Sequence, residues 1–190
     1  KAEYDKFLNY SFYGFGAATP EENETVLTHT TTSLAFTFSR GFTPRLVAEA
    51  GYVVRWLRYT DLRDGPLVDE LAALTGEGRL FAPYLTFALK YDTSDSQIHP
   101  TRGARIIVQE DLAGSFMGSR EASFSRLTVD ARKYLRVFGE KDVFAVRALA
   151  QYVGGEAVPV FDRASLGGGN VLTAMRGFPL NRFLDRGKFL

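Results

Sequence analysis

Hydrophobic and polar residues alternate with a period of two along most of this chain. From Leu46 to Trp56 every even position is apolar, while the odd positions include Glu49 and Arg55. A β-strand with unlike surroundings on its two faces produces this pattern, because successive side chains point to opposite faces. The alternation predicts consecutive antiparallel strands of one curved sheet at Val26–Ser39, Leu46–Tyr59, Leu80–Tyr91, Arg102–Asp111, Ser125–Val137 and Val143–Val153.

The connections between the predicted strands alternate in length. Segments 40–44, 93–101 and 139–142 are short or rich in turn residues, whereas segments 60–79, 113–122 and 154–187 are mostly longer. Outer-membrane barrels have short turns on one rim and long loops on the other, and their tilted strands need about 9–11 residues to span the bilayer. The pattern therefore predicts an all-β fold, an antiparallel transmembrane β-barrel. A weak helical pattern at 67–74 predicts a turn or two of helix within a long loop.

Alternation alone does not say which face points inward. A soluble sandwich buries its apolar faces against each other, whereas a membrane barrel turns them toward lipid and lines its lumen with polar groups. Strand length, aromatic content and loop asymmetry favour the barrel, so we expect outward side chains at Leu34, Phe36, Trp56, Phe87, Val129 and Phe144. Lys133 also falls on an apolar face, so either it lies near a membrane interface, where its ammonium can reach water, or the register shifts there.

Composition narrows the possible classes further. The 190 residues have a mean hydropathy of −0.11 and contain no apolar run of the ~18 residues that a membrane-spanning helix needs. A net charge of +1 provides no basic field for nucleic acid, so no nucleic-acid partner is expected. The absence of cysteine excludes disulfide frameworks and thiolate metal sites in this sequence. An aromatic content of 14% suits the aromatic belts of a membrane barrel.

Catalytic chemistry finds little support in these residues. His29 and His99 lack a convincing nucleophile or acid nearby, and the glycines at 167–169 lack the Lys-Ser/Thr of a phosphate-binding loop. We expect no enzymatic activity, no cofactor and no metal. The charges on the inward faces would instead line a lumen with both signs and could hold a plug loop through charge-assisted hydrogen bonds; they are Glu49, Arg55, Lys90, Arg105, Arg126, Asp130, Arg132 and Arg147.

Three stretches carry a family resemblance. The first is Phe12-Tyr13-Gly14-Phe15-Gly16 with the Thr-Pro-acidic run 19–23, and the second is Tyr91-Asp92 with Pro-Thr-Arg-Gly at 100–103. The third is Gly-Gly at 167–168 followed by Arg-Gly-Phe at 176–178 in the longest loop. In order and spacing they resemble the BamA/TamA superfamily, the bacterial surface-antigen family of outer-membrane insertases and translocases.

The resemblance implies a barrel of about sixteen strands, of which 1–190 would supply about seven or eight as a partial barrel domain without a periplasmic POTRA-type domain. It also implies a loop-lock motif, Gly167, Gly168, Arg176, Gly177 and Phe178, whose tip tucks into the lumen. The acidic partners of Arg176 would lie mostly beyond Leu190, with Asp130 or Glu49 as candidates within this chain.

The function implied is outer-membrane protein insertion or protein translocation in the bacterial outer membrane. The implied partners are the lipid bilayer, client outer-membrane or secreted polypeptides, and periplasmic or lipoprotein accessory factors. Two alternatives remain open at this point. One is a passive porin-like or ligand-binding barrel, and the other is a soluble all-β binding module.

Overall fold

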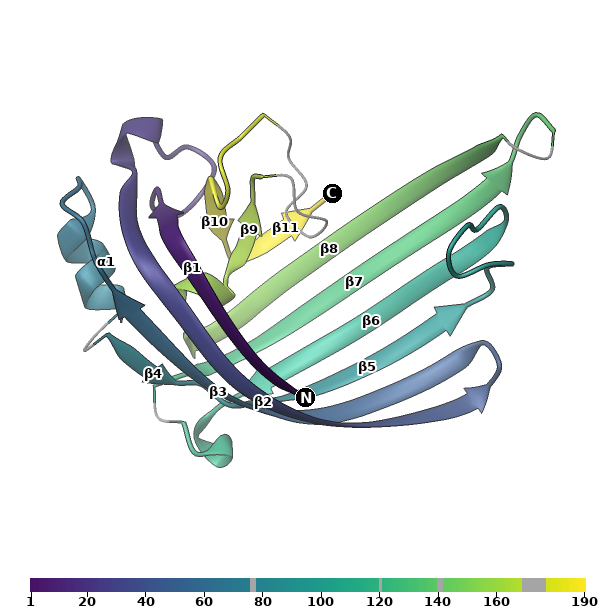
Figure 1. Ribbon diagram of the computed structural model, residues 1–190, viewed down its shortest axis with the longest axis horizontal. Coiled ribbons are helices and arrows are strands. Elements are labelled where there is room, and N and C mark those ends of the chain that lie inside the picture. The colour runs from purple at the N-terminus through teal and green to yellow at the C-terminus, as the bar shows by residue number, and fades with distance from the viewer. Residues whose placement is uncertain (76–77, 120, 140–141, 169–176) are drawn as a thin grey trace.

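The computed structural model describes residues 1–75, 78–119, 121–139, 142–168 and 177–190, and these form one strongly curved antiparallel sheet with a small second sheet inside its hollow (Figure 1). Strands of the main sheet follow the order β1-β2-β3-β5-β6-β7-β8-β11, with β4 also paired to β3. Their bounds are β1 Ala2–Phe12, β2 Thr25–Thr43, β3 Leu46–Thr60, β4 Arg79–Phe81, β5 Tyr84–Asp92, β6 Gly103–Ala113, β7 Ser123–Arg136, β8 Val143–Ala157 and β11 Gly187–Phe189.

The second sheet pairs β9 (Ala164–Leu166) with β10 (Phe183–Asp185). The helical elements in the described ranges are α1 (Val68–Thr75) and three short 3-10 turns, η1 (Glu21–Asn23), η2 (Ser115–Met117) and η3 (Val160–Asp162). α1 confirms the helical pattern expected at 67–74. Among the described residues, no helix has the length and apolar character needed to cross a bilayer.

The predicted strands and their faces are confirmed, with two differences. All six of the predicted strand segments are present, and Leu34, Phe36, Trp56, Phe87 and Phe144 are exposed on the convex face. Val129, the sixth predicted outward residue, is of intermediate exposure and lies opposite the exposed Val108 on the same face. The first difference is that β1 was not predicted. A bulge with Asn9 at φ 55° shifts its register between residues 7 and 10, and this breaks the alternation.

The second difference is that segment 80–91 is interrupted. β4 and β5 both pair with β3, but the strand breaks at Ala82–Pro83. Proline has no backbone N–H to donate to the ladder, so it interrupts the pairing at this point. Lys133 is exposed and pairs with Ala104, the second residue of β6, which places it near the end of the sheet as expected.

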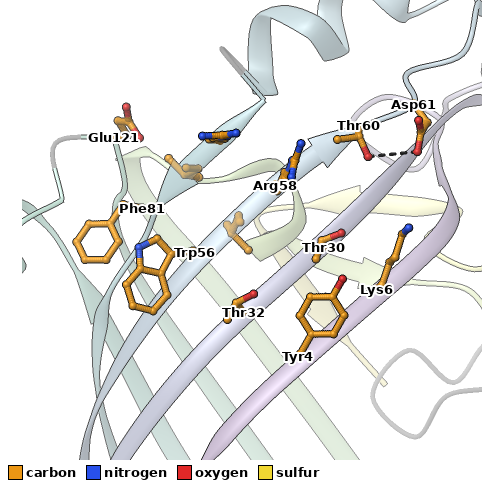
Figure 2. A pocket seen from close by; sticks show the side chains of 13 residues that line it. Tyr4, Lys6, Thr30, Thr32, Trp56, Arg58, Thr60, Asp61, Phe81 and Glu121 are labelled. Carbon is orange, nitrogen blue, oxygen red and sulfur yellow. Dashed lines mark hydrogen bonds between the residues drawn. The ribbon is translucent and has the colours of Figure 1, made fainter.

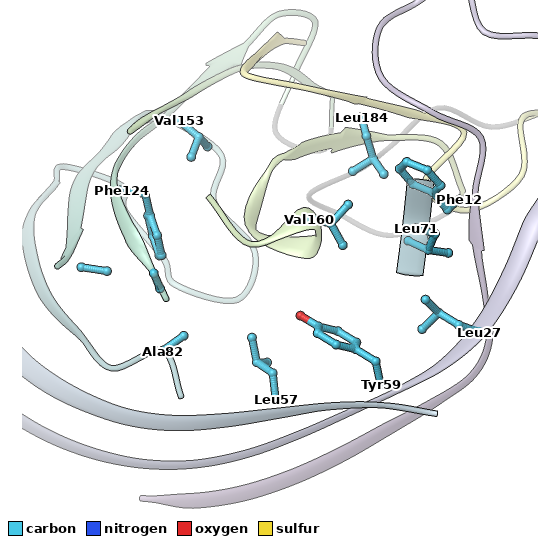
Figure 3. Close-up of a cluster of buried hydrophobic side chains, with 12 residues drawn as sticks. Phe12, Leu27, Leu57, Tyr59, Leu71, Ala82, Phe124, Val153, Val160 and Leu184 are labelled. Carbon is cyan, nitrogen blue, oxygen red and sulfur yellow. The ribbon is translucent and has the colours of Figure 1, made fainter. Parts of the chain in front are cut away.

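The two rims of the sheet differ as the sequence predicts. The turns β2–β3, β5–β6 and β7–β8 lie on one rim, which we call the short-turn rim (Figure 1). The connections β1–β2, β3–β4, β6–β7 and β8–β11 lie on the other, which we call the long-loop rim. Loops at this rim fold over the concave face and build the main apolar cluster there (Figure 3), which includes Phe12, Leu27, Leu57, Tyr59, Leu71, Phe124, Val153, Val160 and Leu184. The core therefore lies inside the curve, at its long-loop end.

Candidate functional site

The connection from β8 to β11 folds back onto the concave face instead of extending away from the rim. It is called here the long loop, residues 158–186. Its turn η3 places Asp162 against the sheet, where the Arg55 guanidinium of β3 donates to both carboxylate oxygens at 2.8 and 2.5 Å. A planar guanidinium that meets a carboxylate through two parallel hydrogen bonds fixes both distance and orientation. The long loop is thus fastened to the wall at residue 162.

A second wall arginine completes this attachment. Arg126 of β7 donates to Asp162 Oδ1 at 3.0 Å, and it also donates to Asp111 of β6 at 2.7 and 2.9 Å. The Tyr84 ring lies under both guanidinium groups, 5.2 Å from that of Arg55 and 5.9 Å from that of Arg126. We call Asp162 with Arg55 and Arg126 the loop anchor. It joins β3, β7 and the long loop, three segments that are far apart in sequence.

Burial makes the loop anchor energetically important. Asp162 is 4% exposed and Asp111 is 1% exposed, so bulk water solvates neither carboxylate. Burial alone raises the pKa of Asp162, but the positive charges of Arg55 and Arg126 outweigh it and hold that pKa below its ordinary value. Asp162 therefore stays charged, and the network satisfies the charges that it buries.

An aromatic contact next to the anchor holds the preceding residue of the loop. The Phe161 ring lies 4.1 Å from the Tyr10 ring, 5.0 Å from the His29 ring and 5.4 Å from the Tyr59 ring, measured between centroids. These three residues come from β1, β2 and β3. Aromatic pairs at such distances contribute beyond their buried area, so Phe161 supplements the ionic contact with an apolar one.

The returning half of the long loop is attached to the β1–β2 connection. Arg182, which is 9% exposed, donates to the Thr19 hydroxyl at 2.9 Å and to the Thr19 carbonyl oxygen at 2.5 Å. The Tyr13 ring lies 5.0 Å from the same guanidinium, and the Gly16 amide donates to the Leu184 carbonyl oxygen at 2.8 Å. The first of the three stretches that carried the family resemblance is therefore attached to the returning half of the long loop.

The loop-lock residues predicted from the sequence are only partly described. Arg176 lies outside the described residues. Gly167 is buried with φ +122°, and a Cβ there would collide with the Pro179 carbonyl oxygen, so this position requires glycine. The Gly168 amide donates to the Phe178 carbonyl oxygen at 3.0 Å. Gly177 is exposed, and the half-exposed Phe178 ring packs on Phe183 of the same loop, 5.3 Å between centroids.

The other predicted inward charges lie on the concave face and pair with one another. Lys90 meets Glu49 at 2.7 Å, while Arg132 and Arg147 both meet Asp130 at 2.8 Å. None of these pairs involves a described residue of the long loop. Of the eight inward charges expected to hold the loop, the structure brings Arg55 and Arg126 to the described part of it. Glu49, Asp130, Arg132 and Arg147 line the wall closer to the short-turn rim.

Sequence reasoning missed Asp162, Phe161 and Arg182. A signal for Asp162 was present in the charge balance of the predicted inward faces. The eight charges expected there comprise the cations Arg55, Lys90, Arg105, Arg126, Arg132 and Arg147 but only the acids Glu49 and Asp130. Buried cations need acids to compensate their charge, so this excess of cations indicated an acid on the loop that plugs the barrel. Arg182 carried no comparable signal.

Comparison with known proteins agrees with this architecture. The sequence model described as the Omp85 superfamily domain matches residues 3–187. Among solved structures, the chain is similar to BamA from Haemophilus ducreyi lacking POTRA domains 1–3, with a TM-score of 0.63 and 14% sequence identity. That match covers 95% of this chain and 35% of the other, so the chain spans about a third of the length of that relative. No curated protein matches this chain.

Proposed function

The chain belongs to the Omp85 superfamily, and from this premise we propose that it forms part of an outer-membrane β-barrel that inserts or translocates client polypeptides at the surface of a bacterial cell. This proposal agrees with the resemblance seen in the three sequence stretches. It needs no cofactor, because strand insertion proceeds by backbone hydrogen bonding between a client strand and a sheet edge.

The loop anchor is the observation that carries the proposal. A buried, charged and bidentate contact holds the loop against the inner wall. Such a contact can keep the loop in place while a client strand pairs with the sheet. A passive channel would lose conductance if such a loop occupied its lumen. The apolar cluster at the long-loop end, with Val160 and Leu184 of the loop against Leu57 of the wall, favours a plugged barrel over an open pore (Figure 3).

The convex face supports a membrane location for this wall. Large apolar side chains are exposed there on successive strands, among them Phe36 at 61%, Phe38 at 71% and Phe144 at 56%. Soluble monomers rarely expose apolar patches of this extent, whereas a barrel wall presents such a face to lipid. This face disfavours the soluble binding module among the alternatives.

The test uses the full-length protein reconstituted in liposomes with an unfolded outer-membrane client. Protection of the client from added protease measures its insertion, and a heat-dependent shift in gel mobility measures folding of the barrel itself. Arg176→Ala should lower client insertion severalfold while the barrel still folds, and Arg176→Lys should restore it only in part, because lysine lacks the bidentate fork. Asp162→Asn should act in the same direction.

Asp185→Asn is the matched control, since Asp185 is an exposed acid of the same loop. It should leave insertion unchanged. Wild-type insertion by both Arg176→Ala and Asp162→Asn would contradict the proposed function of the loop. A steady ion conductance of the wild-type protein in a planar bilayer, without client insertion, would favour the passive channel instead.

A further inference from the structure

The convex face carries a hollow of about 800 Å³ near the long-loop rim, on the opposite side of the sheet from the loop anchor (Figure 2). β1, β2, β3 and β4 form it. In the strand pairing, Lys6 lies opposite Thr30, Thr30 opposite Arg58, and Arg58 opposite Arg79. Residues directly opposite each other share one face of a sheet. Lys6, Arg58 and Arg79 therefore form one row of three cations across four strands.

An aromatic row runs parallel to the cation row. Tyr4 lies opposite Thr32, Thr32 opposite Trp56, and Trp56 opposite Phe81. The Trp56 and Phe81 rings are 5.6 Å apart, and Tyr4 and Trp56 are 66% and 48% exposed. This row lies two residues closer to the short-turn rim, about 7 Å along the strands. In Figure 2 Tyr4 and Trp56 accordingly lie below Arg58, while Asp61 lies above it.

The cations of the row are not neutralised by the described part of the protein. Arg58 and Arg79 are direct partners across the β3–β4 pair, and like charges in that position repel each other. No described residue forms an ion pair with Lys6, Arg58 or Arg79. Two acids, Asp61 and Glu121, also line the hollow, which leaves three cations against two acids. An anion seated between the arginines would relieve their repulsion.

The position of the rows matches one edge of a lipid-facing band. Between Arg58 and Ala48 on β3, ten positions apart, the outward residues Trp56, Val54, Tyr52 and Ala50 carry no charge. Ala48 lies opposite Arg40, the next outward charge. Ten strand residues span about 33 Å, and a tilt of about 40° reduces this to about 25 Å, the height of the apolar band of a membrane barrel. The cation row thus falls at the level of lipid headgroups.

We propose that these two rows, called here the two-row surface, bind the phosphorylated sugar headgroup of a glycolipid of the outer leaflet, the chemical class of lipopolysaccharide. The inference rests on the membrane location in the proposed function, with the long loops on the outer side. The cations receive phosphate groups, while Tyr4, Trp56 and Phe81 lie at the boundary where the acyl chains begin. Lys6 and Arg79 are three strand spacings apart, about 14 Å, so a sugar headgroup with phosphates at both ends spans the row better than a single phosphodiester.

Binding by the full-length protein in detergent tests this proposal. The probes are a bisphosphorylated lipid A, the same glycolipid without phosphates, phosphatidylglycerol and inorganic phosphate, and native mass spectrometry measures occupancy. The variant is Arg58→Gln with Arg79→Gln. Its control is Arg40→Gln with Lys133→Gln, which removes two exposed cations from the convex face at the other end of the band. A heat-dependent mobility shift shows that each variant has folded.

The wild-type protein and the control variant should bind bisphosphorylated lipid A at least tenfold more tightly than the dephosphorylated glycolipid or phosphatidylglycerol. The double variant should lose this preference. Lys6→Gln alone, on a separate strand, should weaken binding in the same direction and serves if the double variant fails to fold. The proposal would be overturned if phosphatidylglycerol bound as tightly as bisphosphorylated lipid A, or if inorganic phosphate displaced the lipid A at equal concentration. An unchanged preference for lipid A in the folded double variant and in Lys6→Gln would also overturn it. Client insertion into liposomes without glycolipid is measured separately, so a failure of the proposed function is distinguishable from a failure of this site.

Discussion

Replacing Asp162 by asparagine removes the acid of the loop anchor while preserving its shape. Arg126 keeps its two hydrogen bonds to Asp111, but Arg55 loses a bidentate ion pair at 2.8 and 2.5 Å. Removing one partner of a buried ion pair costs about 3–5 kcal/mol, because the charge that remains is buried without compensation. The asparagine carbonyl still accepts one hydrogen bond, so the lower part of this range applies. The closed position of the long loop should therefore be weakened by about 3 kcal/mol.

The labelling rate of a buried cysteine in the loop measures this loss of stability, because the thiol reacts only when the loop opens. Ala164 is 2% exposed and lies two residues after Asp162, and the segment contains no cysteine. Ala164→Cys in a full-length protein free of other cysteines should react slowly with a maleimide, because only the opened loop exposes the thiol. Each 1.4 kcal/mol changes an equilibrium tenfold, so Asp162→Asn should accelerate labelling by about a hundredfold. A gel shift with a polyethylene glycol maleimide measures the rate.

Two further variants make the experiment decisive. Asp185→Asn, at an exposed acid of the same loop, should leave the labelling rate unchanged. Arg55→Met combined with Asp162→Asn should recover part of the loss, because the uncompensated charge has also been removed. Labelling of Asp162→Asn at the rate of Asp185→Asn would refute the reasoning, since the loop would then be held by something other than its ionic contact.

The same labelling assay addresses the other contacts of the loop. Gly167→Ala should accelerate labelling more than Gly177→Ala. Both force an L-residue to positive φ at a cost of about 1–2 kcal/mol, but of the two only Gly167 has atoms of the described residues where the Cβ would go. Arg182→Gln should loosen the returning half of the loop, and Thr19→Val should do so less, because the Thr19 carbonyl oxygen remains as an acceptor. The labelling rate is divided by that of an unstructured cysteine peptide at the same pH, which removes the pH dependence of the thiolate itself, and this ratio should be constant above about 4, the ordinary pKa of aspartate. Below that pH the ratio should rise as Asp162 is protonated through its lowered pKa, whereas Asp162→Asn should show no such rise.

The strands could be predicted because the two faces of this sheet meet unlike surroundings along their whole length. Every even position from Leu46 to Trp56 is apolar, and the observed β3 has the predicted faces. β1 escaped prediction for a physical reason, since its bulge at Asn9 moves the side chains after it to the other face. Tyr10 consequently points toward the concave face, where it contacts Phe161, while Tyr4 and Lys6 line the hollow on the convex face. A period-two pattern cannot survive an inserted residue.

The site was predictable only in part, because long-range pairs leave no periodic signal in a sequence. Arg55 and Arg126 could be placed inward from strand alternation alone. Their partner Asp162 is 107 positions from Arg55 and 36 from Arg126, and it lies in a loop, where no period fixes the direction of a side chain. The prediction assigned the cation to the loop and the acids to the wall. At Asp162 the arrangement is the opposite, because the loop supplies the acid and the wall supplies the cations. Arg176 itself lies outside the described residues.

The two wall arginines of the loop anchor differ in their carboxylate partners, and this difference affects the energy of opening the loop. Arg126 lies directly opposite Asp111 in the β6–β7 pair, so the sheet itself supplies a carboxylate whether or not the loop is present. Arg55 lies opposite Ser33 on β2, and its ion pair with Asp162 comes from the loop. When the loop leaves, Arg126 remains compensated, and the cost of opening falls mainly on Arg55. A client or partner that offers a carboxylate to Arg55 would therefore lower the energy of the open state selectively, because only ligands with different affinities for the two states can shift their balance.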